Sequence, residues 1–102
     1  MIRHVVMWKL RGPSPAEKRE QAARVRRALE NLRGKIPGMT SLEVGVGAFQ
    51  DNEQHADVVL VTSHDSWQAL DEYQKHPAHQ AVAQLIGELR VERRVLDFEL
   101  AQ

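Results

Sequence analysis

The residue types best suited to chemistry in this 102-residue chain lie between Tyr73 and His79, where a phenol and two imidazoles surround a proline. Pro77 fits the first position of a helix, because its missing N–H would have no partner there. His76 is then the N-cap and His79 the third helical residue. The positive end of the helix dipole opposes protonation of His79, which predicts a neutral imidazole able to act as a general base near neutral pH.

Tyr73 falls at three-residue steps from Leu70 and Trp67, so the sequence predicts its ring on the inward side of a short helix, at least partly buried. A buried phenol hydroxyl needs a hydrogen-bond partner. Spacing alone favours two interpretations about equally: a core tyrosine bonded to a backbone acceptor, and a tyrosine whose hydroxyl is held for a ligand.

A third imidazole, His4, lies in the apolar N-terminal run and shares its strand parity with Val6 and Trp8. If this face of the strand is turned toward the helices, His4 and Trp8 line the same pocket as Tyr73 and His79. A lone histidine on an apolar strand is more often a satisfied core residue than a site residue, so both interpretations stay open.

A metal site is the alternative use of these imidazoles, since His76 and His79 have a spacing found among helical metal ligands and His4 could be a third. The sequence favours no metal, because a cap residue points differently from a residue in the first turn and the motif lacks a carboxylate. We expect neither a metal nor a cofactor. His55 and His64 lie in or beside predicted loops, which indicates that they face solvent.

Strands and helices are expected in the order β-α-β-β-α-β, with the second helix broken before Pro77. This order is the ferredoxin-like pattern of the α+β class, with an antiparallel four-stranded sheet. Ser14 and Glu17 form a capping box, with Pro15 at the first helical position. A polar loop is expected at residues 50–54. The strands are expected at residues 2–10, 41–49, 56–63 and 91–100. The helices are expected at residues 15–33 and 77–90, with a short helix between them that is capped by Asp65 or Ser66 and ends at about residue 75.

The strand predicted at residues 56–63 is apolar on both parities, which is typical of a strand buried on both faces. Two helices from one chain can cover only one face of a four-stranded sheet. The other face is therefore expected to meet the same face of a second copy, and a specific pairing needs about 800 Å² per partner. The sequence predicts a homodimer.

Length and composition indicate how many domains the chain forms and which classes of partner it does not bind. The chain is expected to form one domain over residues 1–102, and its 14 basic residues balance its 14 acidic ones. There is then no net charge to attract nucleic acid or an anionic membrane. Cysteine is absent, which excludes disulfides and thiolate chemistry, and no apolar run approaches the roughly 20 residues of a membrane helix. We expect a cytoplasmic protein that binds neither nucleic acid nor membranes.

Three segments resemble, in this order, the stress-responsive dimeric α/β-barrel (Dabb) family: MIRHVVMWKL at residues 1–10, IPGM at residues 36–39 and YQKHPAH at residues 73–79. The resemblance covers essentially the whole chain and implies a ferredoxin-like domain that pairs into a dimeric α+β barrel. In the cyclase-like members the matching Tyr hydrogen-bonds the substrate and the matching His removes a proton. The resemblance thus implies catalytic roles for Tyr73 and His79, with His4 at the same pocket.

The expected ligand is a small metabolite, apolar or carbonyl-bearing. Asp57 stands where cyclase-like members can carry a further His, and it is expected either to orient His4 or His79 or to be an exposed strand-end carboxylate. The possible activity is a cofactor-free cyclase or isomerase reaction. The alternatives are a noncatalytic ligand-binding stress-associated dimer and, with little support from the sequence, a cofactor-independent monooxygenase or haem-degrading enzyme. The residues expected to contact the ligand are Trp8, Asp57, Trp67, Val82 and Ile86.

Overall fold

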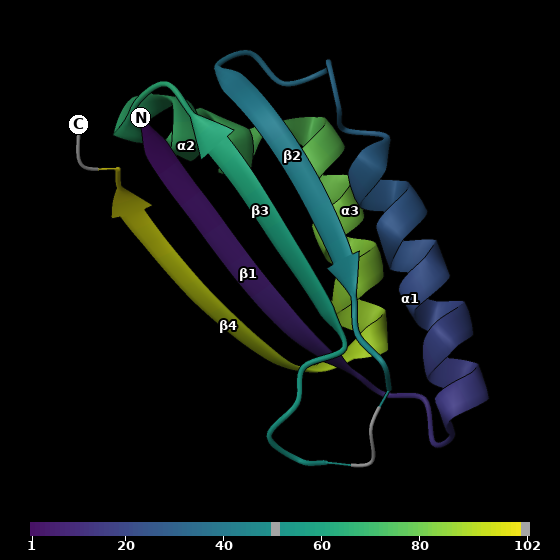
Figure 1. Cartoon of the computed structure of the whole chain (residues 1–102). Coiled ribbons are helices and arrows are strands. Elements are labelled where there is room, and N and C mark those ends of the chain that lie inside the picture. Colours follow the sequence, from purple (N-terminus) through teal and green to yellow (C-terminus); the bar gives the residue numbers. More distant parts are fainter. Residues whose placement is uncertain (50–51, 101–102) are drawn as a thin grey trace.

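The four strands form one antiparallel sheet in the order β2-β3-β1-β4, with β3 and β1 in the middle (Figure 1). The structure is a computed structural model that describes residues 1–49 and 52–100. Its elements are β1 (Ile2–Leu10), α1 (Pro15–Glu30), β2 (Met39–Val46), β3 (Val58–His64), α2 (Trp67–Lys75), α3 (Pro77–Leu89) and β4 (Arg90–Glu99). The ferredoxin-like α+β fold predicted from the sequence is confirmed, with its second helix divided into α2 and α3.

Several element ends differ from the predicted ones. α1 ends at Glu30 instead of residue 33, because Asn31 caps it and a turn follows. β2 begins at Met39 and ends at Val46, and the residues expected to continue it include Phe49, whose φ of 56° does not fit a strand. Part of the predicted polar loop, residues 50–51, lies outside the described residues.

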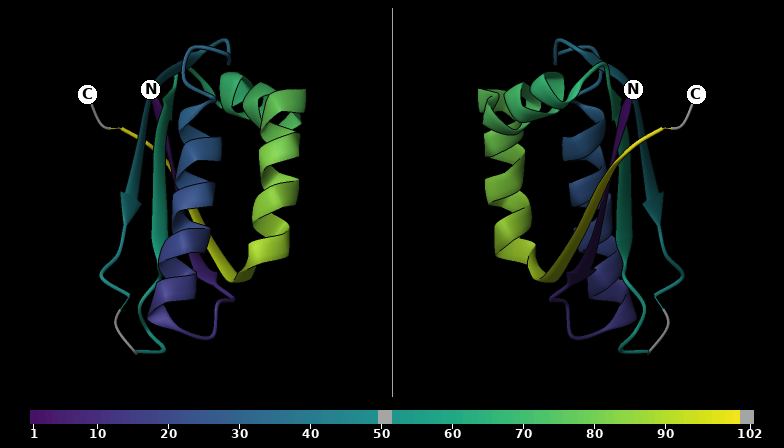
Figure 2. Two further views of the ribbon diagram at one scale, coloured as in Figure 1. Left: turned by 90° about the vertical axis from the view of Figure 1, so that its right-hand side faces the viewer. Right: turned by 90° about the vertical axis from the view of Figure 1, so that its left-hand side faces the viewer.

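The helices α1 and α3 cover the same face of the sheet, which we call the inner face (Figure 2). Ser14 accepts a hydrogen bond from the Glu17 N–H at the start of α1, so the predicted cap is confirmed. α1 turns Ala22, Val25 and Leu29 toward the sheet, whose buried side chains complete the core. The core residues of the sheet include Ile2, Val6, Trp8, Leu10, Leu42, Val58 and Leu60.

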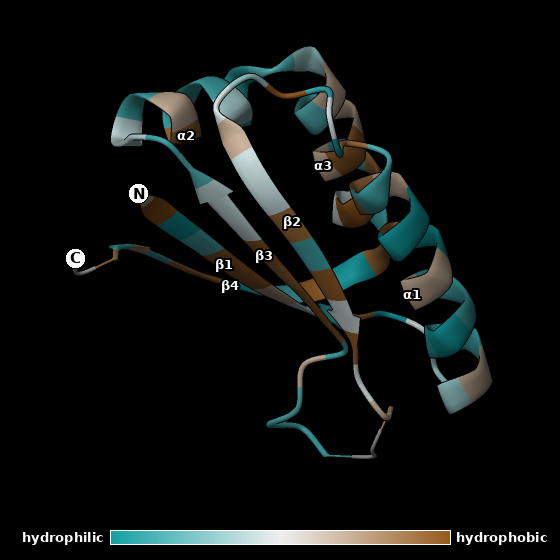
Figure 3. Ribbon diagram, turned by 45° about the horizontal axis from the view of Figure 1, so that its top comes forward, coloured by the Kyte–Doolittle hydropathy of each residue, from teal (hydrophilic) through white to brown (hydrophobic). Residues whose placement is uncertain are grey.

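The opposite face of the sheet, here the outer face, carries an apolar centre; no helix of the described residues covers this face (Figure 2). Directly opposed residues of antiparallel strands point to the same side, so the pairing of Val5 with both Val61 and Leu96 places the three side chains together. Met7 and Val59 form the next pair on this face. Leu96 is 63% exposed and Met7 44%, and Figure 3 shows the hydrophobic run along β3. The centre of this face is apolar and open to solvent in one chain.

Gly38 sits where the turn before β2 passes close to α2. Its φ is +79°, and a Cβ built on it would lie 2.8 Å from the Cβ of Ala69 in α2. Its carbonyl also accepts a hydrogen bond from the Asp65 N–H at 2.9 Å, which ties the turn to the end of β3. Any other residue here would be strained in its backbone and would push α2 away.

We expect Gly38→Ala to lower the free energy of unfolding by about 2–4 kcal/mol, combining left-handed backbone strain with the contact to Ala69. Gly34→Ala is the matched control, because Gly34 has a φ of +80° but a Cβ added to it would meet no heavy atom within 4 Å. It should lose about 1–2 kcal/mol. Urea denaturation followed by circular dichroism measures both, and equal losses would show that the approach to Ala69 does not matter.

Candidate active site

A cavity of about 260 Å³ lies between the inner face of the sheet and the helices α2 and α3. Of the eight residues predicted for the site, six line this cavity: His4, Trp8, Tyr73, His79, Val82 and Ile86. Asp57 and Trp67 do not. The remaining lining residues are Val6, Leu29, Leu60, Ala83, Arg90 and Arg93.

The break between α2 and α3 positions Tyr73 and His79, the two residues best suited to catalysis. His76 is the C-cap of α2 and the N-cap of α3, and its Nδ1 accepts a hydrogen bond from the Ala78 N–H at 3.1 Å. Pro77 follows as the first residue of α3. Tyr73, near the end of α2, and His79, in the first turn of α3, therefore lie close together, with ring centroids 4.3 Å apart. His76 serves the backbone, as the sequence indicated.

Tyr73 is fully buried, and within the described part of the chain its hydroxyl has no hydrogen-bond partner. Burial raises the pKa of Tyr73 to about 12, although the positive charge of Arg93 acts in the opposite direction. The phenol is thus protonated across the physiological range. Since a buried, unpaired hydroxyl costs about 1–3 kcal/mol, its position on a cavity wall favours the interpretation that it donates to a ligand.

His79 is held with one nitrogen bonded and the other available. Its Nδ1 lies 3.2 Å from the carbonyl oxygen of Gln74, which can only accept, so Nδ1 carries the proton and Nε2 keeps a lone pair. Burial lowers the pKa of His79 most strongly; the Gln74 hydrogen bond opposes this, while the charges of His4, Arg93 and His76 add to it. Burial is therefore the main cause that favours the neutral imidazole, whereas the sequence analysis had attributed the neutral form to the helix dipole.

His4 lies on the inner face of β1, with its ring centroid 5.8 Å from that of Tyr73. It is buried, and its Nδ1 is paired with the carboxylate of Asp97 on β4. The two residues are direct partners in the β1–β4 register. Asp97 therefore fixes the orientation of the imidazole, a role that the sequence analysis did not assign to it. Strand parity in β4 was the signal that could have identified Asp97.

Residues 2–100 match the sequence profile of the stress responsive A/B barrel domain, Dabb. This chain belongs to the Dabb family. It is 27% identical to a dimeric ferredoxin-like protein of unknown function from Bacteroides fragilis, with a TM-score of 0.83 and coverage of 97% of this chain and 95% of the other. A dimeric ferredoxin-like protein from Thermobifida fusca is 25% identical, with a TM-score of 0.80 and coverage of 97% and 90%.

The hydroxynitrile lyase of Passiflora edulis shares the fold at 14% identity, with a TM-score of 0.80 and coverage of 99% of this chain and 94% of the lyase. No curated protein matches the sequence. In the described part of this Dabb domain, no helix is long and apolar enough to cross a membrane. Nor do the described residues place three or more His, Asp or Glu side chains together in a geometry suited to a metal ion.

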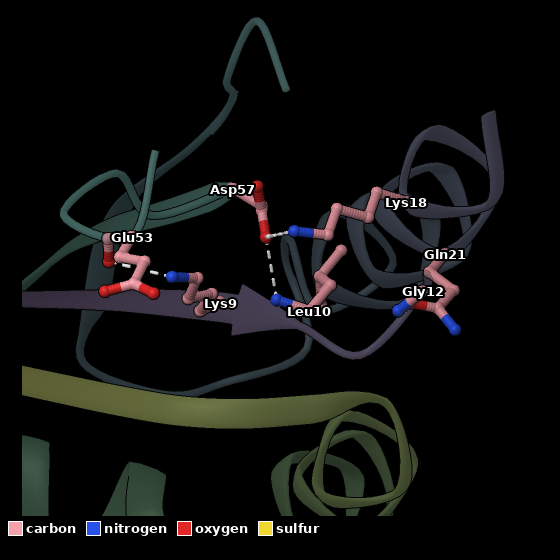
Figure 4. Close-up of polar contacts among 7 residues, drawn as sticks. All are labelled: Lys9, Leu10, Gly12, Lys18, Gln21, Glu53 and Asp57. Atoms are coloured by element: carbon pink, nitrogen blue, oxygen red, sulfur yellow. Dashed lines mark hydrogen bonds and ion pairs between the residues drawn. The ribbon is translucent and has the colours of Figure 1, made fainter. Parts of the chain in front are cut away.

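Asp57 of this Dabb domain lies beside Leu10 at the end of β1 (Figure 4). His4 is near the start of that strand, so the expectation that Asp57 orients His4 or His79 is wrong. The alternative of an exposed carboxylate is also wrong, because Asp57 is 3% exposed. Its Oδ2 accepts a hydrogen bond from the Leu10 N–H at 2.8 Å and lies 3.9 Å from Lys18 Nζ. The carboxylate ties the end of β1 to the start of α1 and supports the fold.

Trp67 is the first residue of α2 and is 52% exposed, so the prediction that it faces the pocket is corrected. Leu70 and Tyr73 of the same helix are buried. A helix has 3.6 residues per turn, so a strict three-residue step drifts by about 60° each time. Two such steps carry Trp67 well away from the face that holds Tyr73.

His64 is fully buried, although the sequence analysis placed it in solvent. β3 extends through His64, and strand parity puts it on the inner face with Leu60 and Thr62. Its ring centroid lies 4.9 Å from that of Tyr73, and its Nε2 is 2.9 Å from Thr62 Oγ1. Burial lowers the pKa of His64 to about 4, and the charge of His4 adds to this, while Asp97 and Asp65 oppose it. The missed histidine is thus a neutral neighbour of the site.

We expect the buried His64 to make the domain less stable as the pH falls. Its folded pKa of about 4 lies below the ordinary value of 6.5, so the unfolded chain takes up the proton first. The loss begins near pH 6.5 and approaches about 3 kcal/mol toward pH 4. His64→Gln should flatten this dependence in urea denaturation measured at each pH. His55→Gln, an exposed control, should retain the wild-type slope; a wild-type slope in His64→Gln would contradict the assignment.

Proposed function

We propose that this Dabb domain is a cofactor-free enzyme that removes a proton next to the carbonyl group of a small, largely apolar metabolite, as cyclases and isomerases do. The observation that carries the proposal is the unpaired, fully buried hydroxyl of Tyr73 on the wall of a cavity that also holds the ring of His79. A donor and a neutral base side by side form the minimum apparatus for enolisation.

In this mechanism the substrate carbonyl accepts a hydrogen bond from the Tyr73 hydroxyl. Nε2 of His79 takes the proton from the adjacent carbon, and negative charge develops on the carbonyl oxygen that Tyr73 holds. His4 acts as a positioning residue, since Asp97 orients its ring beside Tyr73. General-base catalysis and stabilisation of the developing oxyanion are each worth about 10²- to 10³-fold in rate.

The aliphatic part of the lining supports an apolar substrate body. Val82 and Ile86 of α3 face Val6 and Leu60 of the sheet across the cavity. The same walls and the same hydroxyl also suit a domain that holds its ligand without turnover. That noncatalytic alternative predicts saturable binding with no proton exchange at the ligand.

We expect His79→Ala to reduce catalysed hydrogen–deuterium exchange by at least about 100-fold and Tyr73→Phe by about 10²- to 10³-fold. The measurement is the proton NMR signal next to the ketone of 4-oxo-4-phenylbutanamide in heavy water. His55→Ala removes an exposed imidazole outside the cavity and is the control. Exchange that survives His79→Ala would exclude this mechanism, whereas binding without exchange in the wild type would favour the noncatalytic alternative.

We further propose that the domain works as a homodimer whose two outer faces meet in an α+β barrel. The apolar centre of this face, formed by Val5, Met7, Val59, Val61 and Leu96, supports the pairing. The similar proteins from Bacteroides fragilis and Thermobifida fusca are both described as dimeric. Covering such a face removes apolar surface from water at about 25 cal/mol per Å², so two copies gain stability by association.

Leu96→Asp should convert the dimer to a monomer at micromolar concentration, because it would place a charge at the centre of the paired faces. Leu96 is 63% exposed in one chain, so the fold itself should survive. Trp67→Asp is the matched control: it also replaces an exposed apolar residue, but on the helical side of the molecule. Sedimentation equilibrium measures the mass, and a dimeric Leu96→Asp would rule out this interface.

A further inference from the structure

The charged side chains of the cavity are all of one sign. Arg90 and Arg93 of β4 line it, and no Asp or Glu does. In the described part of the chain, neither arginine takes part in an ion pair. The carboxylate of Asp97, four residues further along β4 than Arg93, is paired with His4. The positive charge at this end of the cavity is therefore left without a counterion from the protein.

The arginines and the proposed reacting groups share the same space. Arg93 pairs with Trp8 across the β1–β4 register and Arg90 with Leu10, which puts both at the Trp8 end of the inner face, away from His4. Arg93 is exposed at the cavity mouth. Burial raises the pKa of Tyr73 and lowers that of His79; the positive charge of Arg93 opposes the first shift and adds to the second.

We propose that the ligand of this cavity is an anionic carbonyl compound, whose carboxylate contacts Arg93 and Arg90 while its carbonyl reaches the unpaired hydroxyl of Tyr73. The proposal rests on the function proposed above and names its substrate class: an oxo acid with an apolar body. A guanidinium presents planar paired donors that match a carboxylate, and such charge-assisted bonds are about twice as strong as neutral ones. The arginines would hold the carboxylate end of the ligand and Tyr73 its carbonyl oxygen, which would place the carbon next to the carbonyl beside His79.

The arginines would also offset the charge that the reaction develops on such a substrate. Proton removal from an oxo acid adds a second negative charge, on the enolate oxygen, to the carboxylate already present. Because Arg93 and Arg90 would pair with the carboxylate, the enolate charge held by Tyr73 would develop beside a neutralised group, whereas an aliphatic wall alone would leave two unscreened negative charges. The chain has no net charge, so this attraction is a local property of the cavity.

The test compares 4-oxo-4-phenylbutanoate with its neutral amide by isothermal titration calorimetry on the wild-type protein. The two compounds differ in charge and little in shape. We expect the acid to bind about 10- to 100-fold more tightly at low ionic strength, with the preference decreasing as salt is added. Arg93→Gln should remove most of the preference for the acid, and adding Arg90→Gln to this variant should reduce the preference further. Arg24→Gln, on the exposed side of α1, is the control and should leave it intact.

Equal affinity for acid and amide, a preference unchanged in Arg93→Gln, or no binding of the acid at millimolar concentration would each overturn the inference. Inorganic phosphate titrated alone tests for a plain anion site, and affinity equal to that of the acid would also overturn it. Unfolding midpoints in urea confirm that the variants fold. These readouts measure binding, so they are independent of the exchange assay. If the proton-abstraction mechanism is wrong, the preference for the acid can still be measured. If the preference is absent, exchange that depends on His79 can still be measured.

Discussion

One proline decides where the site can form. Pro77 cannot donate the backbone hydrogen bond that would continue α2, so the chain changes direction at His76 and α3 begins at a marked angle to α2 (Figure 2). His76 has extended backbone, with ψ of 134°, and satisfies the Ala78 N–H with its ring. In a continuous helix Tyr73 and His79 would lie about 120° apart around the axis. The break instead puts their rings 4.3 Å from each other, over β1.

Burial favours the uncharged form of three neighbouring side chains at the site. It raises the pKa of Tyr73 and lowers those of His64 and His79, and all three shifts favour the neutral form. A neutral phenol donates, while a neutral imidazole with a bonded Nδ1 accepts at Nε2. The same desolvation that leaves the Tyr73 hydroxyl without a partner therefore suits it and His79 to complementary roles. The other ionisable groups around the site are His4, paired with Asp97, and the arginines of β4.

The sequence was sufficient for features set by local rules. Capping residues and periodicity identified every element of the fold, and the position of Pro77 identified the pair of Tyr73 and His79. The sequence-based predictions were wrong at residues whose surroundings depend on the pairing register of the strands. Asp57 directly precedes β3 and Asp97 lies in β4, yet only the pairing of β1 with β4 shows that Asp97 meets His4. His64 was misplaced because the end of a strand depends on its neighbours, and one residue more puts the ring in the core.

The alternation of β1 links the two faces of the sheet. His4 points to the cavity and pairs with Asp97, while the next residue, Val5, points to the outer face and pairs with Leu96. A shift of one residue in this register would move the imidazole into the proposed dimer interface and the valine into the site. Two chains meeting through their outer faces would hold β1 and β4 in place from behind. Association would then rigidify the backbone that carries His4, Asp97 and Arg93, so the proposed dimer and the proposed chemistry depend on the same strand pairing.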